Sequence, residues 1–225
     1  MFILEGQEMV EKKHWNELWK RHKKNFLLEF LDNIQSRGCF QIYLKLLKCK
    51  KLPKKINIIE LGSGTGKLSL KLYKFFNNCK CTLVDYSKSA LELSKRKFKE
   101  NNIHNQNFIY ANVLEFKTKK KYDIVHSGGL IEHFSGSELN KIVRKHVELC
   151  KKNGLIIIMV PAPLLWYKLY RKTMECLGKW PKNIETPMDE HYLVQLTEKN
   201  GIKVLDSTMS RGLVRSSFII GTPKK

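Results

Sequence analysis

An α/β fold with a mostly parallel sheet is the fold class that the sequence predicts, and two observations support it. After Lys55, short apolar runs alternate with segments of helical periodicity, and the connections between them are short. The first run, residues 56–61, is rich in isoleucine and leucine, which is typical of a strand buried on both faces. Because each parallel strand needs a right-handed crossover, this alternation predicts a doubly wound sheet with helices on both faces.

Strands are expected where short apolar runs lie between turn residues. Such runs cover residues 56–61, 81–84, 107–110, 122–126, 155–160, 202–205 and 217–220. Sheets of this class bind their ligands at the carboxyl ends of the strands. Chemistry is therefore expected just after Leu61, Val84, Tyr110, His126 and Val160.

The helices between the strands are predicted from apolar residues that recur every three or four positions. Their inner faces are marked by Leu68, Leu72, Phe75 and Phe76, then by Ala90, Leu91, Ser94 and Phe98, then by Leu139, Ile142, Val143, His146, Val147 and Cys150. The third of these helices is expected to begin at Ser135-Gly-Ser-Glu138, which has the capping-box spacing, and to end at Asn153-Gly154. A last helix is expected to have Thr186 as its N-cap, Pro187 in its first turn and Gly201 as its stop.

Residues 1–52 are expected to form a helical cap in front of a single domain over residues 53–225. Within the cap, residues 14–31 have the apolar spacing of one helix. A second, shorter helix is marked by Phe40, Tyr43, Leu44 and Leu47. Residues 161–187 are expected to be irregular, because they are rich in aromatic residues and contain four prolines.

The composition indicates a folded protein with a packed core, since 42% of the 225 residues are hydrophobic. The longest apolar run, Gly154–Tyr167, is too short for a membrane span and contains Pro161 and Pro163. Acidic residues near the amino terminus leave no apolar region typical of a secretory signal, so a cytoplasmic location is expected. The six cysteines are then expected to be reduced thiols in the interior.

The net charge of +21 would suit a nucleic-acid-binding protein. However, 35 of the 42 basic residues are lysines, and they are spread over every segment of the chain. Arginine is the residue that reads guanine and binds phosphate through two parallel hydrogen bonds. The charge therefore favours a solvated basic surface over a dedicated nucleic-acid site.

A glycine-rich turn and an acidic residue lie where a ligand is expected. Gly62, Gly64 and Gly66 follow the first strand and permit close approach of the backbone to a ligand. Lys67 stands where a dinucleotide fingerprint would have its third glycine, which disfavours a nicotinamide cofactor. Asp85, nineteen residues after Gly66, ends the second strand and can accept hydrogen bonds from both hydroxyls of a ribose. The ligand is therefore expected to contain a nucleoside.

Four segments of the chain resemble the motifs of the class I methyltransferase family. They are Ile58–Gly66, Val84–Ser87, Tyr110–Glu115 and Tyr122–Ser127, and the resemblance extends over roughly residues 56–220. It implies S-adenosylmethionine as the cofactor. It also implies a seven-stranded sheet whose last strand is antiparallel to the others.

The resemblance also implies which residues bind the cofactor. They are Glu60, Gly62, Ser63, Gly64, Gly66, Asp85, Tyr86, Asn112, Val113 and Ser127. The glycine turn and Glu60 would contact the methionine part, Asp85 the ribose, and Tyr86 one face of the adenine. Asn112 replaces the aspartate that is commoner in the family, and its amide oxygen can still accept a bond from the adenine amino group.

Glu132 and His133 resemble the end of a Glu-x-x-Glu-His metal site found in quinone-biosynthetic O-methyltransferases of the family. Gly129 stands at the position of the first glutamate, so no metal is expected. His133 is the candidate general base, because imidazole titrates near neutrality. The alternative is that the Glu-His pair only orients its loop. His191 is a weaker second candidate, and His146 is expected to be a core residue.

Residues 161–187 occupy the place where members of the family build a lid on the substrate side. Aromatic residues of this lid and of the cap would enclose an apolar acceptor or, alternatively, only pack together. They are Trp15, Trp19, Tyr43, Trp166, Tyr167, Tyr170 and Trp180.

The predicted function is transfer of a methyl group from S-adenosylmethionine to an oxygen or nitrogen, most simply of a small molecule. A nucleic-acid methyltransferase is a rival, but Ser127-Gly-Gly-Leu130 replaces the Asn/Asp-Pro-Pro-Tyr/Phe motif of enzymes that methylate exocyclic amines. The other rivals are a nicotinamide oxidoreductase and a non-catalytic protein that binds S-adenosylmethionine. Neither the acceptor nor the oligomeric state follows from the sequence.

Overall fold

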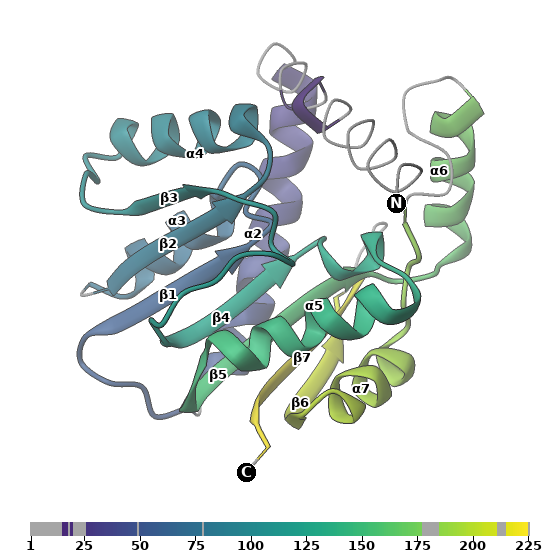
Figure 1. Ribbon diagram of the computed structural model, residues 1–225. Coiled ribbons are helices and arrows are strands. Elements are labelled where there is room, and N and C mark those ends of the chain that lie inside the picture. Colours follow the sequence, from purple (N-terminus) through teal and green to yellow (C-terminus); the bar gives the residue numbers. More distant parts are fainter. Residues whose placement is uncertain are drawn as a thin grey trace.

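A seven-stranded sheet with helices on both faces forms the body of the protein (Figure 1). The computed structural model describes residues 15–17, 19, 26–48, 50–77, 79–176, 185–210 and 215–224. The strands are β1 (Ile56–Leu61), β2 (Cys79–Asp85), β3 (Asn107–Tyr110), β4 (Tyr122–Gly128), β5 (Cys150–Pro161), β6 (Ile202–Met209) and β7 (Ser216–Pro223). Their order is β3-β2-β1-β4-β5-β7-β6, and β7 is antiparallel to β5 and β6. The predicted fold class, including the antiparallel last strand, is confirmed.

The helices cover the two faces of the sheet in two groups. They are α2 (Phe26–Leu47), α3 (Lys67–Phe75), α4 (Lys88–Glu100), α5 (Gly136–Leu149), α6 (Leu165–Cys176) and α7 (Glu190–Lys199), with a 3-10 turn η1 at Ile131–His133. Buried side chains of α2, α3 and α4 form one apolar cluster with the sheet, and those of η1, α5 and α7 form another. Figure 1 accordingly shows α2 behind the sheet and α5 in front of it.

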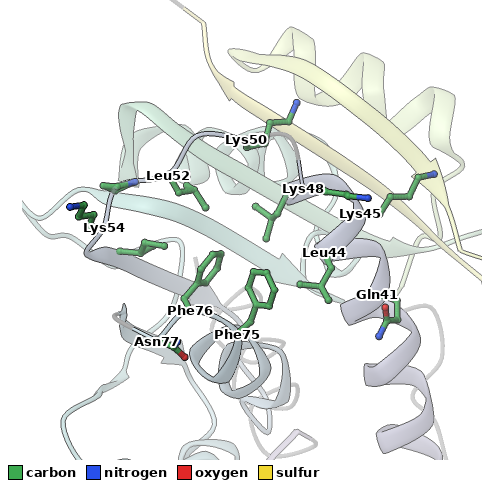
Figure 2. A pocket seen from close by; sticks show the side chains of 13 residues that line it. Gln41, Leu44, Lys45, Lys48, Lys50, Leu52, Lys54, Phe75, Phe76 and Asn77 are labelled. Carbon is green, nitrogen blue, oxygen red and sulfur yellow. The ribbon is translucent and has the colours of Figure 1, made fainter.

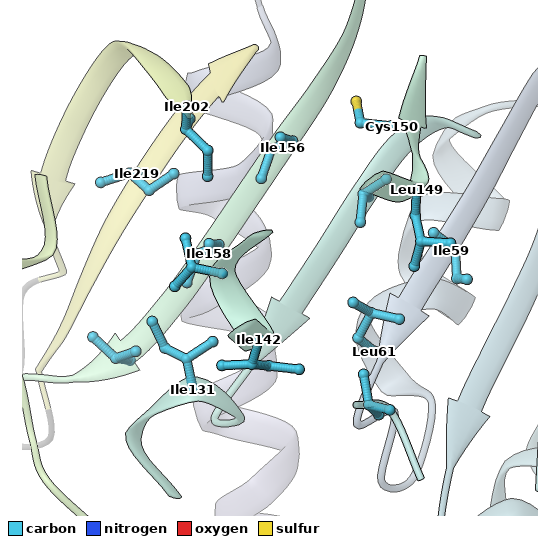
Figure 3. Packing of buried hydrophobic residues seen from close by; sticks show 14 of the residues in the cluster. Ile59, Leu61, Ile131, Ile142, Leu149, Cys150, Ile156, Ile158, Ile202 and Ile219 are labelled. Atoms are coloured by element: carbon cyan, nitrogen blue, oxygen red, sulfur yellow. The ribbon is translucent and has the colours of Figure 1, made fainter. Parts of the chain in front are cut away.

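Alternation along the central strands supplies both clusters, because successive side chains of a strand point to opposite faces. Ile58 and Ile157 face α2 and α3, whereas Ile59, Ile156 and Ile158 face α5 and α7. Figure 3 shows the second cluster, in which Ile158 lies between Ile131 and Ile219. All five strand isoleucines are fully buried, and each such burial stabilises the fold by roughly 1.5–3 kcal/mol.

Helix α2 is longer than the second helix predicted for the cap. We expected two helices with a break between residues 31 and 40, but α2 continues through this region as 22 residues from Phe26 to Leu47. Asp32, Ser36 and Gly38 lie within the helix, although these residue types disfavour helix interiors. Packing of Cys39, Tyr43 and Leu46 against the sheet stabilises the helix across them.

The transition from α5 to β5 also differs from the prediction. The helix ends at Leu149, and β5 begins at Cys150, so Asn153-Gly154 lies inside the strand and does not end the helix. The pairing with β4 shifts register between Tyr122 and Ile124. A Cβ at Gly154 would meet the Cys150 Sγ at 2.7 Å and the Asp123 carbonyl oxygen at 3.0 Å. Glycine is needed here for close approach at a bulge.

Two predicted helix starts are only partly correct. Ser135 is the N-cap of α5, but its side chain makes no cap hydrogen bond, so the predicted capping box does not form. The N-cap of α7 is Asp189, whose side chain accepts from the Tyr192 N–H at 2.8 Å, and Thr186 lies upstream of the helix. The Thr186 N–H instead donates to the Glu132 carbonyl oxygen at 2.8 Å. Gly201, with φ +92°, follows the C-cap of α7 as predicted.

The lid region is not irregular, because it contains the twelve-residue helix α6. Trp180 and the side chains of Trp166 and Tyr170 lie outside the part of the chain that is described. Of the five described cysteines, all are free thiols, and Cys39, Cys81 and Cys150 are buried as expected, whereas Cys176 is exposed. Within the described residues, no helix is long and apolar enough to cross a membrane.

Candidate functional site

The glycine turn follows β1 at the carboxyl edge of the sheet. Gly62, Gly64 and Gly66 have φ angles of 62°, 51° and 66°, a region that favours glycine. A Cβ at Gly66 would also meet the Leu83 Cδ2 at 2.7 Å and the Ser94 Oγ at 3.0 Å. The Ser63 N–H donates to the Val84 carbonyl oxygen at 3.1 Å, which fixes the turn against β2. The turn therefore has a fixed backbone conformation at the edge of the sheet.

Asp85 lies beside this turn, as its place at the end of β2 predicted. Its Oδ2 accepts from the Gly64 N–H at 2.8 Å, and its Oδ1 accepts from the Ser87 N–H at 2.8 Å. Burial raises the pKa of Asp85 to about 6, and the backbone N–H groups of Ser87 and Gly64 limit that rise. A carboxylate has about four acceptor sites, and the Tyr86 N–H also donates to Asp85, so only part of this acceptor capacity remains for a ligand.

The loop that follows β3 lies at the same edge of the sheet, next to the end of β2. The Ala111 N–H donates to the Asp85 carbonyl oxygen at 3.1 Å, which places the Asn112 loop next to the end of β2. The Asn112 Oδ1 accepts from the Leu114 N–H at 3.0 Å, and this bond shapes the loop itself. Val113 is buried and Tyr86 is half-buried. The three predicted adenine-side residues are therefore on adjacent strand ends.

Ser127, at the end of β4, directs its side chain into the core. Its Oγ lies 2.9 Å from the Nε2 of His146, and the His146 Nδ1 lies 2.8 Å from the Ile142 carbonyl oxygen. Since a carbonyl only accepts, Nδ1 carries the proton and Nε2 accepts from the Ser127 hydroxyl. Burial lowers the pKa of His146 to about 4, and the ring is neutral. His146 is a core histidine, as predicted, and the Ser127 hydroxyl is bound to it.

A network of buried, hydrogen-bonded polar side chains connects to Glu60, near the glycine turn. The sequence analysis missed this network. The His126 Nδ1 is 3.4 Å from the Tyr43 hydroxyl, and its Nε2 is 3.3 Å from the Ser69 Oγ. Burial lowers the pKa of His126 to about 3, so it is neutral. Ser69 also bonds to Glu60, whose pKa burial raises to about 8. The signal in the sequence was a histidine inside an apolar strand.

Four buried polar atoms have no hydrogen-bond partner within the described residues, and they fall in two places. Glu60 Oε2 and Ser63 Oγ lie at the glycine turn, and Glu132 Oε2 and Arg171 Nε lie around η1 and α6. Buried polar groups are normally hydrogen-bonded, so such atoms mark positions that a ligand or water completes. Both places lie at the carboxyl edge of the sheet.

His133 belongs to a cluster of charged side chains at the second place. Its Nε2 lies 4.0 Å from the Glu185 Oε1. The Tyr167 hydroxyl donates to the Glu185 Oε2 at 2.6 Å, and the Arg171 Nη1 donates to the Glu185 carbonyl oxygen at 2.7 Å. Burial, together with Glu185, raises the pKa of Glu132 well above its usual value. Glu185, an acidic residue of the lid, therefore lies next to His133. The sequence analysis did not identify Glu185.

The described residues of the amino-terminal segment contact both the region of the glycine turn and the His133 cluster. Trp15 contacts His133 edge-on, with ring centroids 5.0 Å apart and planes at 83°. The Asn16 Oδ1 accepts from the Ser87 Oγ at 2.8 Å, next to Asp85. Trp19 packs on Gly64, where an added Cβ would lie 3.1 Å from its Cζ2. This segment covers the glycine turn and the His133 cluster together.

A cavity of about 290 Å³ adjoins η1. Its lining is mainly apolar and comes from Phe134, Ser135, Gly136, Leu139, Pro163, Thr186, Pro187, Met188, Asp189 and Tyr192. His191, the second candidate base, is exposed on α7 and bonds through its Nε2 to the Gln195 Nε2 at 2.9 Å. Among the described residues, no three His, Cys, Asp or Glu side chains are placed to hold a metal ion.

Comparison with curated proteins finds methyltransferases. The chain is 30% identical over 124 residues to malonyl-(acyl-carrier protein) O-methyltransferase 1 of Ilyobacter polytropus, a match that covers 55% of this chain and 44% of that protein. It is 31% identical over 112 residues to pavine N-methyltransferase of Thalictrum flavum subsp. glaucum, covering 49% of this chain and 32% of that protein. The chain therefore matches less than half of the length of either relative.

Solved structures share the fold. A magnesium protoporphyrin IX methyltransferase from Synechocystis PCC 6803, with bound SAH, superposes with a TM-score of 0.74 at 17% identity, covering 96% of this chain and 100% of that one. The N-methyltransferase NodS from Bradyrhizobium japonicum WM9, also with S-adenosyl-L-homocysteine, gives a TM-score of 0.68 at 14% identity, with 94% and 99% covered. At these identities the likeness establishes the fold.

The family comparison covers the part of the chain that contains this edge of the sheet. A family described as Methyltransferase domain matches residues 52–201, which include the glycine turn, Asp85 and His133. This match agrees with the four motifs and with the strand order. The chain belongs to the methyltransferase domain family.

Proposed function

We propose that the protein transfers the sulfonium methyl group of S-adenosylmethionine to an oxygen or nitrogen of a small-molecule acceptor. The observation that carries this proposal is the position of the four unpartnered polar atoms, two at the glycine turn and two beside His133. The first pair fits a cofactor and the second fits an acceptor. Relatives named as O- and as N-methyltransferases are consistent with either acceptor atom.

The residues at the glycine turn fit the chemistry of S-adenosylmethionine. Glu60 Oε2 and Ser63 Oγ are buried and unpartnered within the described residues, and the amino acid part of the cofactor carries an ammonium and a carboxylate. A cation beside Glu60 would favour its ionised form, against the burial that raises its pKa. Asp85 would hold the ribose through the acceptor capacity that its backbone partners leave. Tyr86, Asn112 and Val113 would border the adenine, and the backbone of Ser127 the methionine part.

On the acceptor side, His133 would take the proton that an acceptor hydroxyl or ammonium must lose. Glu185, 4.0 Å from its Nε2, would stabilise the imidazolium that forms. The Tyr167 hydroxyl and the Arg171 guanidinium hold Glu185 in place. Glu185 is thus a positioning residue, and His133 is the residue that touches the acceptor.

The cofactor supplies a methyl group that is already activated, so the protein's main task is alignment. Trp15 packs on His133 and Trp19 on Gly64, so these two rings would exclude water from a ligand bound between them. The covered site would then bring the acceptor atom in line with the methyl group. Proton removal by His133 is required only for an acceptor that is protonated at neutral pH.

Incubation of the protein with methyl-labelled S-adenosylmethionine and a fractionated metabolite extract tests this proposal. We expect labelled methyl groups in one class of small molecule, detected by mass spectrometry, and much less label with the Asp85→Ala variant when the cofactor concentration is limiting. Label that appears only in RNA would contradict the small-molecule acceptor. Absence of any transfer, with S-adenosylmethionine bound, would favour a non-catalytic binding protein.

A further inference from the structure

A second, larger cavity lies at the opposite end of the sheet from the site described above (Figure 2). It has a volume of about 890 Å³, and Ile56, the first residue of β1, lines it. The glycine turn follows Leu61, the last residue of the same strand. Since a strand rises about 3.3 Å per residue, the cavity and the turn are separated by the length of β1. The cavity is therefore no part of the methyl-transfer site.

The floor of this cavity is apolar and partly open to solvent. Figure 2 shows Phe75 and Phe76, at the end of α3, beneath Leu44 and Leu52. Phe75 is 52% exposed, although it contacts Phe76 with ring centroids 4.9 Å apart. A large aromatic side chain left open in a concave apolar surface is typical of a ligand site.

The rim of the cavity carries four lysines and no acidic residue. Lys45 and Lys48 come from the end of α2, and Lys50 and Lys54 come from the segment before β1. Figure 2 shows these lysines on different sides of the apolar centre, with their ammonium groups pointing outward. Within the described residues, none of the four has a carboxylate within ion-pair distance. Four cations around an apolar hollow, with no carboxylate near them in the described part of the chain, attract an anion.

We propose that this cavity binds a single-chain anionic amphiphile, an alkyl chain that ends in a carboxylate or a phosphate. The chain would lie on Phe75, Phe76 and Leu52, and the anionic end would meet the lysines of the rim. The volume lies within the range of small-molecule sites, roughly 300–1,000 Å³. A concave floor fits one inserted chain better than the flat surface of a bilayer. The proposal is independent of methyl transfer.

Titration with decanoate, kept below its micelle concentration and followed by calorimetry, tests this inference. We expect saturable binding of decanoate, and much weaker binding of decanol, which lacks the charge, and of butyrate, which lacks the chain. The double variant Lys48→Glu/Lys54→Glu should bind decanoate about tenfold more weakly, because two attractive charges become repulsive. Phe75→Ser should weaken binding through the apolar floor.

The matched control is Lys95→Glu/Lys141→Glu, which makes the same change of charge at two exposed positions outside the cavity. This variant should bind decanoate as the wild type does, and both double variants should retain binding of S-adenosylmethionine if they are folded. Equal weakening by the two double variants would overturn the proposal, since it would mean attraction to the net charge alone. Equal binding of decanol would overturn it too. Binding only to vesicles of anionic phospholipid would identify a membrane surface in its place.

Discussion

Replacement of Asp85 by alanine separates the two tasks that the structure gives to this carboxylate. Its Oδ1 and Oδ2 accept from Ser87 and Gly64, both at 2.8 Å, and in the proposed complex the ribose would take the acceptor capacity that is left. Loss of two charge-assisted bonds to ribose hydroxyls should cost about 2 kcal/mol of binding free energy. The dissociation constant for S-adenosylmethionine should therefore rise roughly 30-fold.

The same substitution leaves the Gly64 and Ser87 N–H groups without their acceptor. Each buried donor that loses its partner costs about 1–3 kcal/mol, so the free energy of unfolding should fall by about 2–6 kcal/mol. Isothermal titration at pH 7.5 measures the first effect, and urea denaturation measures the second. Asp206→Ala is the matched control, because Asp206 is an exposed acid on β6. A folded Asp85→Ala variant with wild-type affinity would refute the assignment of the ribose.

Three further predictions follow from the site and the fold. Because the pKa of Asp85 is about 6 and ribose hydroxyls bind its ionised form, affinity for S-adenosylmethionine should be greatest above pH 6 and fall as the pH drops through 6. Titrations from pH 5 to 7.5 should show this fall in the wild type and not in Asp85→Ala. A fall in both proteins would show that another group causes it. His133→Ala should slow methyl transfer to a protonated acceptor about 10²–10⁴-fold. Glu185→Gln should slow methyl transfer less and shift the pH profile of the rate, and neither variant should change cofactor affinity. Unaltered turnover of His133→Ala would mean that His133 only orients its loop. Gly154→Ala should lower the free energy of unfolding by about 1–3 kcal/mol through overpacking against Cys150. Gly38→Ala, in open space on α2, should raise the free energy of unfolding by about 0.5–1 kcal/mol. Equal effects of the two substitutions in urea denaturation would contradict the bulge at Gly154.

Local patterns were sufficient for the sheet and for the cofactor edge. The bounds of β1 and β3 agree with the apolar runs that predicted them, since both runs end at turn residues. The predicted proximity of the glycine turn and Asp85 is present as the bond between Gly64 and Asp85. It follows from the parallel pairing of β1 and β2, because the carboxyl ends of neighbouring parallel strands lie at one edge.

Features that depend on contacts distant in the sequence were predicted wrongly or missed. The continuity of α2 across Gly38 depends on packing of Tyr43 and Leu46 against strands that come later in the chain. The place of Gly154 inside β5 depends on the β4 backbone beside it. Propensity and capping patterns describe only the neighbours of a residue, so they indicated a helix end at Asn153-Gly154 that the structure does not have.

The contacts missed at the site also join residues that are distant in the sequence. Glu185 is 52 positions from His133, and the contact exists because the Thr186 N–H bonds to the Glu132 carbonyl oxygen. The chain from Tyr43 through His126 to Ser69 joins three elements that no motif connects. A histidine within an apolar strand was the available sign, and its partners become visible only when α2 packs on the sheet.

A crystal structure of the protein with S-adenosylhomocysteine tests most directly whether the glycine turn and Asp85 hold one ligand between them. We expect both ribose hydroxyls within hydrogen-bond distance of the Asp85 carboxylate, and the amino acid part of the ligand beside Glu60 and Ser63. A ligand bound elsewhere in saturated crystals, or a ribose turned away from Asp85, would contradict this.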